Sequence, residues 1–502
     1  MTEPRLLSTE QIAEHNNAKD LWIVVDGQVW DLTEFAPEHP GGIGIILQYA
    51  GHDASQPYNE IHAPSLLNKT LTSSKLVGTL DTSTISDSWA KPPPQQNPTV
   101  QLKNEKPPLF TLLSTHDFES VAEKTLAPKT WAFYSSAATD LVTHKANQSF
   151  FDRIWFRPRV LRNIRTRDTS AKILGQKVEL PIMCSPAAMA KLVHPDGEKA
   201  IARACQSKGI IQCVSTNASF PIEDIASSLS PSQNNGPSPL FFQLYVSKTR
   251  AASEALLRQV WSLGIRTVFL TVDSPLAGKR EADERVRMDD DQQGIPMMTG
   301  VGKPLNDKRG GGLGRITGSF IDEGLDWSDL PWLRRHWKGK IVLKGIMCAA
   351  DASRAAQEGL DGIVVSNHGG RNLDTAPPAI LILLDLHRNA PHVFDTLEVY
   401  VDGGIRRGTD ILKAICLGAT AVSLGRPFLY SLNYGPEGVE YLIDMLKEEL
   451  SVAMALVGIT ALEQAHPGLV NTNDVDYLVP TTEGHPYAKK KKRNQQPLKA
   501  RM

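Results

Sequence analysis

Eight short apolar runs, separated by segments of helical length, are the feature of this 502-residue sequence that most restricts its fold. The runs are IMCSPAA (182–188), IIQCVST (210–216), LFFQLYV (240–246), TVFLTVD (267–273), KIVLKGI (340–346), GIVVSNH (362–368), EVYVDGG (398–404) and AVSLGRP (421–427). Their alternation with helical segments such as GEKAIARACQSKG is typical of βα units and a parallel sheet. Eight such units predict an α/β fold, a (β/α)8 or TIM barrel over residues 109–480.

Polar side chains gather at the ends of these runs, where strands are expected to pass into loops. They are Ser215, Gln243, Tyr245, Asp273, Lys344, His368, Asp402 and Arg426. Because a barrel of this kind carries its active site at the carboxyl ends of its strands, these side chains mark the predicted site. The long segment 274–339 contains RGGGLGR, which predicts an ordered helix followed by a flexible lid over the barrel mouth.

Three segments outside the barrel differ from it in composition. Residues 1–80 predict a compact module, with two strand-like runs around Asp26-Gly27, and carry ten acids against four bases, a net charge of −6. Residues 81–108 are rich in Ser, Thr, Gln and Pro and predict a flexible linker. Residues 481–502 include KKKKRNQQPLKARM, which carries seven bases and no acid, and predict a disordered tail.

Composition excludes several classes of protein. Hydrophobic residues make up 41% and charged residues 22%, as in ordinary globular proteins, and the net charge of −1 argues against nucleic acid as the main partner. The five cysteines form no CxxC pair, so neither a disulfide framework nor a zinc site is expected, and a reducing compartment fits best. No stretch predicts a membrane span or a targeting leader. The cytoplasm is therefore expected, or the peroxisome, since the final Ala500-Arg501-Met502 loosely resembles a peroxisomal address.

Two histidines of the N-terminal module, His39 in HPGG and His62 in NEIHAP, suit a haem site. Two neutral imidazoles can hold a haem iron at both axial positions, which leaves no position for oxygen and favours electron transfer. Alone, the pair could equally be turn or surface histidines. The longer pattern WIVVDGQVWDLTEFAPEHPGG, followed by AGHDAS and IHAP, resembles the cytochrome b5 haem domain. The resemblance implies an α+β fold for this module, with haem b held by His39 and His62, and leaves His52 at the surface.

The barrel runs carry a second set of chemical groups. In SNHGGR, His368 can take a proton from a substrate while the planar fork of Arg371 suits a carboxylate. Asp273 could fix the tautomer of the imidazole. The glycine-rich VDGGIRRG and SLGRPF lie where barrels commonly hold a phosphate. Lys344 could stabilise an anion on a reduced flavin or, as a rival chemistry, form a Schiff base, although any one of these residues could be purely structural.

The motifs SNHGGRNLD, VDGGIRRGTD, LGRPFLY, FQLYV and TVDSP, in this order, resemble the FMN-dependent α-hydroxy acid dehydrogenase and oxidase family. The resemblance covers residues 109 to about 470 and implies that His368 is the active-site base, with Asp273 as its partner. Arg371 and Arg280 would bind the carboxylate and the transition state, and the hydroxyl of Tyr245 would contact the substrate.

The same resemblance implies the residues that bind FMN. Lys344 would face the N1 and O2 edge of the flavin. The other implied contacts are Pro186, Ala187, Ala188, Ser215, Gln243, Thr271, Asp402, Gly403, Gly404, Ile405, Arg406, Gly425 and Arg426.

Together, the two resemblances imply a haem-coupled enzyme that oxidises an (S)-2-hydroxy acid, L-lactate by default, and passes electrons from FMN through haem b to an acceptor such as cytochrome c. They also imply a homotetramer and, as an alternative compartment, the mitochondrial intermembrane space. Two other hypotheses stay open: an oxidase that gives electrons to oxygen and releases hydrogen peroxide, and an electron carrier with an inactive barrel.

Two residues depart from the pattern of the lactate-specific members. Phe133, in WAFYSSAA, stands where the family usually has a tyrosine, so one hydroxyl contact to the substrate carboxylate is missing unless Tyr134 supplies it. Asn217, in VSTNAS, stands where an apolar residue usually faces the substrate methyl. Because a buried amide without partners is costly, Asn217 is expected to bond either a polar substrate group or the protein.

Overall fold

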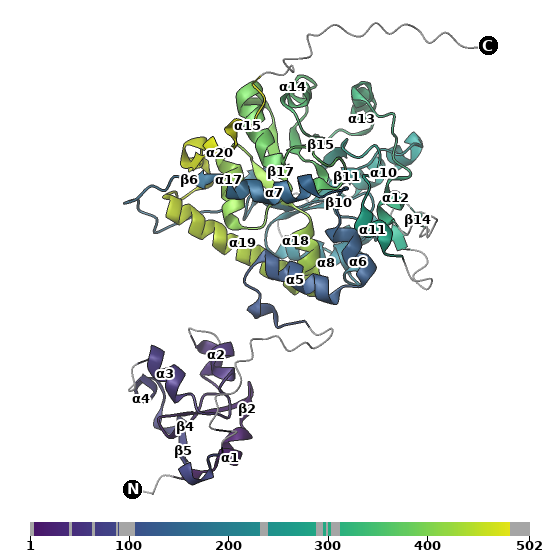
Figure 1. The fold of residues 1–502 in the computed structure, drawn as a ribbon. Coiled ribbons are helices and arrows are strands. Elements are labelled where there is room, and N and C mark those ends of the chain that lie inside the picture. The colour runs from purple at the N-terminus through teal and green to yellow at the C-terminus, as the bar shows by residue number, and fades with distance from the viewer. Residues whose placement is uncertain are drawn as a thin grey trace, which may run out of the picture. The chain divides into compact units, whose positions relative to one another are not determined.

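The computed structural model describes residues 5–39, 43–62, 66–86, 89, 106–230, 239–287, 295–297, 300–302 and 312–481. The chain divides into two compact units, residues 1–103 and 104–502. Figure 1 colours the first unit purple and the second from blue to yellow. None of the helices in the described ranges is long and apolar enough to cross a lipid bilayer.

The first unit contains a five-stranded sheet and short helices. Its strands, in the order β1-β5-β4-β3-β2, are β1 (Leu6–Leu7), β5 (Leu76–Leu80), β4 (Gln28–Asp31), β3 (Asp20–Val25) and β2 (Asn16–Asn17). The turn between β3 and β4 places Asp26 and Gly27 at φ 51° and 78°, the left-handed pair that a two-residue hairpin turn requires. The helices are α1 (Thr9–Ala13), α2 (Ile43–Leu47), α3 (Ser55–Ile61) and α4 (Leu66–Thr70).

The segment expected to be a linker begins later than residue 81. Thr82–Thr84 form a short 3-10 helix, and Thr84 Oγ1 accepts a hydrogen bond from the Thr9 backbone at 3.0 Å. Trp89 is buried, donates through Nε1 to the Gly51 carbonyl at 3.1 Å and stacks on His52. His52 is therefore half-buried rather than a free surface residue. The remainder of the predicted linker, up to residue 105, lies outside the described residues.

The second unit is the barrel that the sequence predicts, because each of the eight apolar runs supplies one strand. All neighbouring strands pair in parallel, and the last pairs with the first to close the barrel. The strands are β9 (Ile182–Cys184), β10 (Ile211–Ser215), β11 (Leu240–Leu244), β12 (Thr267–Thr271), β15 (Lys340–Ile346), β16 (Gly362–Val365), β17 (Glu398–Asp402) and β18 (Ala421–Leu424).

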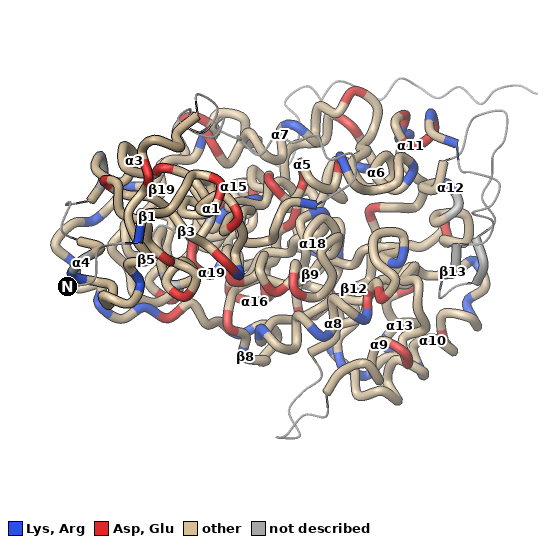
Figure 2. The backbone as a smooth tube through the Cα atoms, turned by 90° about the horizontal axis from the view of Figure 1, so that it is seen from below, with Lys and Arg blue, Asp and Glu red and all other residues tan. Residues whose placement is uncertain are grey.

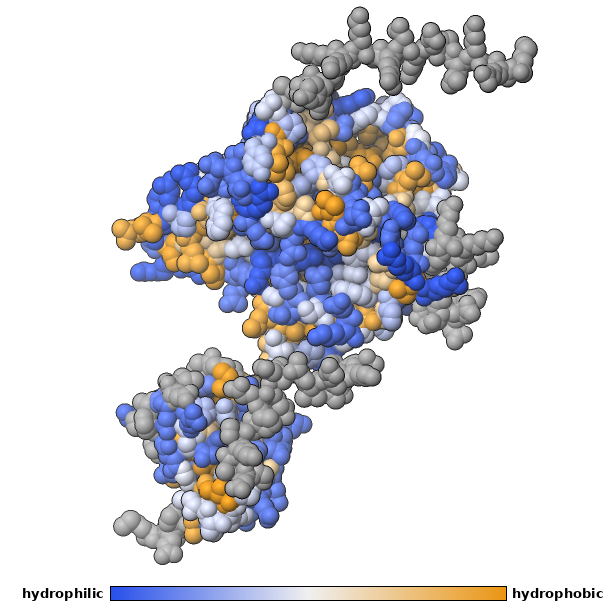
Figure 3. Space-filling model, in the orientation of Figure 1, coloured by the Kyte–Doolittle hydropathy of each residue, from blue (hydrophilic) through white to orange (hydrophobic). Residues whose placement is uncertain are grey.

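Two apolar cores follow from the two faces of these strands. Alternate residues such as Phe241, Phe269 and Val342 fill the inside of the barrel, where they pack with residues of a hairpin, β7 (Ala171–Ile173) and β8 (Gln176–Val178). The intervening residues, such as Phe242 and Val268, pack outward against the helices. On the side seen in Figure 3, the outer surface of this unit is mainly hydrophilic, with smaller apolar patches.

Helices cover the barrel and lead into it. Three precede it: α5 (Thr115–Thr125), α6 (Pro128–Ser135) and α7 (Val142–Asp152). Helices that lie between the barrel strands are α8 (Gly197–Ser207), α9 (Ile222–Ser227), α10 (Arg250–Ser262), α13 (Leu330–His336), α14 (Ala349–Gln357), α15 (Ala379–Asn389), α16 (Val393–Thr396) and α17 (Gly408–Cys416). After the last strand come α18 (Arg426–Leu432), α19 (Gly435–Val457) and α20 (Asn473–Asp476). Strands β6 (Trp155–Phe156) and β19 (Val470–Asn471) pair with each other.

The long segment between β12 and β15 begins with the helix that the sequence predicts. It contains α11 (Glu281–Arg285), a hairpin of β13 (Ile295–Met297) and β14 (Gly300–Gly302), and α12 (Leu313–Gly318). The predicted lid falls largely on residues 288–294 and 303–311, which lie outside the described residues, as does the predicted tail from residue 482 onward.

Candidate functional site

The inner face of the barrel has one polar layer at its carboxyl end. Every strand carries an apolar inward residue, such as Phe269 or Val342, and two positions later a polar one. This spacing follows from the two-residue period of a strand, which returns each second side chain to the same face. The eight residues of this polar layer are Ser185, Ser215, Gln243, Thr271, Lys344, Ser366, Asp402 and Ser423.

A cavity opens above this layer and occupies about 1010 Å³, including the part open to solvent. Most of the predicted site residues line it. They are Pro186, Ala187, Ala188, Ser215, Tyr245, Arg280, Lys344, His368, Arg371, Asp402, Gly403, Gly404, Ile405, Arg406, Gly425 and Arg426. Three predicted residues do not line the cavity: Asp273, Gln243 and Thr271. Asp273 bonds His368 and Gln243 bonds Ser215, which both line it, and Thr271 bonds Gln243.

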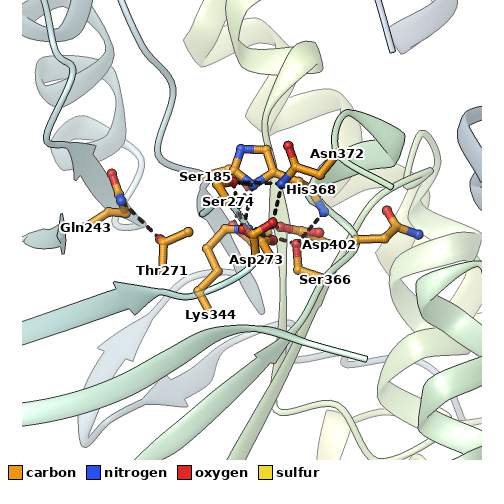
Figure 4. A network of polar contacts seen from close by, with 12 residues as sticks. Ser185, Gln243, Thr271, Asp273, Ser274, Lys344, Ser366, His368, Asn372 and Asp402 are labelled. Carbon is orange, nitrogen blue, oxygen red and sulfur yellow. Dashed lines mark hydrogen bonds and ion pairs between the residues drawn. The ribbon is translucent and has the colours of Figure 1, made fainter. Parts of the chain in front are cut away.

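The loop after β16 presents the candidate base. His368, Gly369 and Gly370 lie at φ 58°, 63° and 75°, three successive left-handed residues, and the Asn367 side chain caps this turn by accepting from the Gly370 backbone at 3.0 Å. His368 Nδ1 lies 2.8 Å from Asp273 Oδ1, which leaves Nε2 available to a ligand in the cavity (Figure 4). A left-handed histidine costs free energy, so this conformation is held by its contacts.

Charge and burial act in opposite directions on this pair. Burial lowers the pKa of His368 below its ordinary value, and the nearby Asp273 carboxylate only partly opposes the shift. Burial disfavours ionisation of Asp273, yet the charges of His368 and Lys344 outweigh it and hold its pKa below the ordinary value. A neutral imidazole beside an ionised carboxylate is the state that a general base requires.

Lys344, at the end of β15, is a buried cation held by three partners. Its Nζ lies 2.8 Å from Ser366 Oγ, 3.0 Å from Asp402 Oδ2 and 3.9 Å from Asp273 Oδ2. Burial opposes its charge, but the two carboxylates more than compensate and raise its pKa. A lysine held protonated is a poor nucleophile, which argues against the Schiff-base alternative and favours a fixed positive charge beside the cavity.

Three of the arginines that line the cavity are Arg280, Arg371 and Arg426. Arg371 donates through one guanidinium nitrogen to the carbonyls of Phe133, Tyr134 and Ser136, at 3.0, 3.0 and 3.1 Å. Its other nitrogens have no hydrogen bond to the described residues, so they can bind an anion. Arg280 donates to the Arg371 carbonyl at 3.4 Å. Burial lowers the pKa of Arg371 and of Arg280. The charge of Arg280 lowers the pKa of Arg371 further, and the charge of Arg371 lowers that of Arg426.

Arg426 differs from the other two in how its side chain is used. It donates to the carbonyls of Tyr134, Gly369 and Ser136, at 2.9, 3.2 and 3.1 Å. These bonds connect α6 to the loop that bears His368. The Arg426 side chain therefore holds α6 and the His368 loop together. Its predicted contact with a phosphate stays a prediction.

Phe133 and Asn217, the two residues that depart from the family pattern, have different surroundings in the structure. Tyr134 does not replace the missing hydroxyl, because its OH donates to the Ala188 and Met189 carbonyls at 2.9 and 2.8 Å. Phe133 lines the cavity, with its ring 5.2 Å from the guanidinium carbon of Arg371. Asn217 has found a protein partner, since its Nδ2 donates to the Thr317 carbonyl of α12 at 3.0 Å.

The cavity fits a flavin mononucleotide. The loop after β9 brings backbone of residues 186–188 to one wall, and the buried Asp402 Oδ1 has no hydrogen-bond partner among the described residues. Gly403 and Gly404 lie at φ 90° and 83° and line the cavity with backbone, while a Cβ at Gly404 would meet the Asn147 carbonyl of α7. Lys344 supplies the positive charge that an electron-accepting ring favours. Gln243 bonds Ser215, Thr216 and Thr271, so its predicted contact with the flavin stays a prediction.

The first unit brings its two predicted ligands together. His39 follows a short 3-10 helix (Ala36–Glu38), and His62 directly follows α3. Their ring centroids lie 6.0 Å apart, which suits one metal ion between the rings, because a metal–imidazole bond is about 2.0 Å long. Phe35 and Tyr58 flank the histidines, and an apolar core with members such as Leu32 lies beside them. These residues fit a haem with two axial histidines.

Five polar residues of the site were not singled out by the sequence analysis. Ser185 and Ser423 face each other across 2.6 Å and line the cavity, and Ser366 accepts from both Lys344 and the His368 backbone. Ser274 and Asn372 contact the His368–Asp273 pair. The two-residue strand period would have found the first three, each two positions after an inward apolar residue.

Comparison with known proteins gives two family matches. The model for FMN-dependent dehydrogenase matches residues 122–472, and the model for the cytochrome b5-like heme/steroid binding domain matches residues 8–81. The chain is 37% identical over 491 residues to L-lactate dehydrogenase (cytochrome) of Wickerhamomyces anomalus, covering 96% of this chain and 82% of the relative.

Two further likenesses cover the barrel. Glycolate oxidase of Spinacia oleracea is 38% identical over 360 residues, which is 70% of this chain and 94% of the relative. The solved structure of the recombinant flavin-binding domain of baker's yeast flavocytochrome b2 is 37% identical, with a TM-score of 0.64 over 76% of this chain and 91% of that one.

Proposed function

The chain belongs to the FMN-dependent dehydrogenase family, and we propose on this basis that it oxidises an (S)-2-hydroxy acid, L-lactate by default, to the 2-oxo acid and passes the electrons through haem b to a cytochrome. The observation that carries this proposal is the His368–Asp273 pair, 2.8 Å apart, beside a cavity that Arg371 and Lys344 also line. A base, a carboxylate-binding cation and a flavin-facing cation are the groups that this oxidation needs.

The side chains divide the reaction among them. The free nitrogens of Arg371, with Arg280 beside it, bind the substrate carboxylate and orient its Cα–H bond. His368 Nε2 accepts a proton from the substrate, and ionised Asp273 stabilises the resulting imidazolium. Bound FMN supplies the two-electron acceptor, and bound haem supplies the one-electron carrier to the external partner.

The haem-binding unit favours a cytochrome-linked dehydrogenase over an oxidase that transfers electrons directly to oxygen. The glycolate oxidase match covers 70% of the chain, whereas the match to the cytochrome-linked dehydrogenase covers 96%. An enzyme that reduces oxygen directly at its flavin has no use for a haem between two histidines. We therefore favour a cytochrome as acceptor over oxygen.

The acceptor that we propose is cytochrome c. Residues 1–80 carry ten acids and four bases, and Figure 2 shows Asp and Glu at many positions along the backbone of this unit. Such an excess of negative charge attracts a basic protein and makes the association sensitive to salt. Reduction of cytochrome c that slows as salt is added is the expected result. An unchanged rate would exclude this docking mode.

The homotetramer implied by the resemblance is also a proposal. Large apolar side chains stay exposed on the second unit around Trp155, Val160, Leu161 and Leu456, and such side chains are common where subunits meet. Light scattering on the purified protein measures its mass directly. A monomer would exclude the tetramer without affecting the proposed reaction.

Anaerobic stopped-flow spectroscopy tests the proposed function. The protein is mixed with L-lactate, then with glycolate and with longer 2-hydroxy acids, while flavin bleaching and the haem α-band are followed together. We expect bleaching of the flavin followed by reduction of the haem. Bleaching without haem reduction would favour the oxidase, and no bleaching with any acid would contradict the proposed substrate class.

A further inference from the structure

Two residues outside the expected site, Ser274 and Asn372, close a hydrogen-bonded ring around the base and its carboxylate (Figure 4). Ser274 Oγ lies 3.1 Å from both Asp273 Oδ1 and His368 Nδ1. Asn372 Nδ2 donates to Ser274 Oγ and to the Asp273 carbonyl, each at 2.7 Å. Ser274 follows β12, whereas Asn372 follows the His368 turn, so these bonds join the two loops that carry the reacting pair.

The donors and acceptors in this ring can be arranged in one consistent way. The Asp273 carbonyl is only an acceptor, so the Asn372 amide must present its NH2 group to it and to Ser274. Ser274 Oγ then accepts from Asn372 and has one proton left to donate. An ionised carboxylate only accepts, so His368 Nδ1 must carry the hydrogen that lies between it and Asp273, and Ser274 also donates its proton to the carboxylate. The ring therefore keeps the tautomer in which His368 Nε2 is free.

The two loops that carry the hydrogen-bonded ring are packed closely against each other. A side chain at Gly278 would come within 2.3 Å of the Asn372 carbonyl oxygen, so the loop after β12 runs directly against residues 371–372. The Asn372 Oδ1 atom is buried and has no hydrogen-bond partner among the described residues. The amide is thus kept in place by its two donated bonds, and removing their acceptor at Ser274 leaves a buried donor less well satisfied.

We propose that Ser274, oriented by Asn372, is a positioning residue for the His368–Asp273 pair and sets the pH range over which the base works. The inference rests on the proposed oxidation of a 2-hydroxy acid. By donating to the carboxylate, Ser274 weakens the stabilisation that Asp273 gives to protonated His368. Lys344 from β15, Arg280 before α11 and Arg371 on the same loop also face His368. Tyr245 after β11 lines the same cavity and is a further hydrogen-bonding neighbour of Ser274. The variants below leave all four of these side chains in place.

The test compares three variants of the full-length holoenzyme: Ser274→Ala, Ser274→Thr and, as control, Ser262→Ala on the exposed face of α10. Anaerobic flavin reduction by the substrate is measured against pH. For Ser274→Ala, we expect the rate to fall about three- to tenfold, as for loss of one hydrogen bond, with flavin and haem content unchanged. We also expect the acid limb of the profile to move to higher pH, because unshielded Asp273 favours protonated His368.

The remaining outcomes decide the proposal. Threonine keeps the hydroxyl, so Ser274→Thr should restore both the rate and the acid limb, while Ser262→Ala should match the wild type. A Ser274→Ala profile equal to that of the wild type, or moved to lower pH, overturns the proposal. So does an equal defect in the alanine and threonine variants, which would indicate packing instead. A wild type that no 2-hydroxy acid reduces would refute the proposed function, which is a separate result.

Discussion

The haem-binding unit brings its two histidines together within a short stretch of chain, residues 39 to 62, whereas the barrel collects its site from helices, loops and strands between residues 133 and 429. In the first unit, the end of one short 3-10 helix and the end of α3 place the ligands. In the barrel, groups far apart in sequence meet because eight parallel strands end at one rim.

Substitutions at the two sites are therefore expected to differ in their effects. A histidine at the haem site has one task, so its loss removes one cofactor. Residues of the barrel site share partners: Ser366 bonds both Lys344 and the His368 backbone, and Asp273 lies near Lys344 and His368. Changes at such shared residues are therefore expected to be non-additive.

Replacement of His62 should give the largest difference in effect between the haem site and the flavin site. We propose that His39 and His62 hold the haem iron, so His62→Ala should lose haem and all haem-dependent reduction of a cytochrome. Flavin reduction by the hydroxy acid should stay within twofold of the wild-type rate. Absorption spectra and stopped-flow measurements check both parts. Slower flavin reduction would show that the two sites are not independent.

Replacement of His368 is expected to have the converse effect. His368→Gln removes the base while keeping a polar side chain, so flavin reduction should fall by about 10²–10⁴-fold, the usual contribution of a general base. The haem spectrum should not change, since His39 and His62 belong to the other unit. A variant that keeps wild-type rates would remove His368 from the proposed mechanism.

The pH profile sharpens the comparison within the barrel. Burial lowers the pKa of His368 below its ordinary value of 6.5, and the base works in its neutral form. Activity should therefore persist below pH 6.5 and fall about tenfold per unit once the pH passes below the lowered pKa. The pH dependence of kcat/KM at saturating acceptor measures this limb. A limb above pH 6.5 would contradict the direction of the shift.

The smallest expected effect comes from Phe133→Tyr. The change restores a hydroxyl beside Arg371, whose ring contact with Phe133 spans 5.2 Å. One hydrogen bond to the substrate carboxylate should lower KM about three- to tenfold, with a smaller change in kcat. Phe110→Tyr serves as the control, because it adds the same hydroxyl to an exposed ring that does not line the cavity and should not affect KM. An unchanged KM in Phe133→Tyr would show that the carboxylate lies elsewhere.

Much of the site could be anticipated because periodic patterns are local. Asp402 and Lys344 end apolar runs, and a two-residue period already puts them on the inside of a barrel. Ser274 and Asn372 could not be anticipated this way. Each is polar and lies in a loop, and their contact exists only because the loops after β12 and β16 run side by side. The side-chain use of Arg426 and Tyr134, which both turn toward backbone carbonyls, was hidden for the same reason.

Short-range patterns were enough to predict the eight-stranded barrel, the pair of histidines proposed to hold haem and the types of group around the cavity, because strand period, turn residues and motif order act over short distances along the chain. The tertiary structure alone decided which hydrogen bonds those groups make. It gave Asn217 a partner in α12, closed the ring of Ser274 and Asn372 around the base, and joined Trp89 to the first unit. Hydrogen bonds depend on tenths of an ångström between atoms distant in sequence, and only the folded chain fixes such distances.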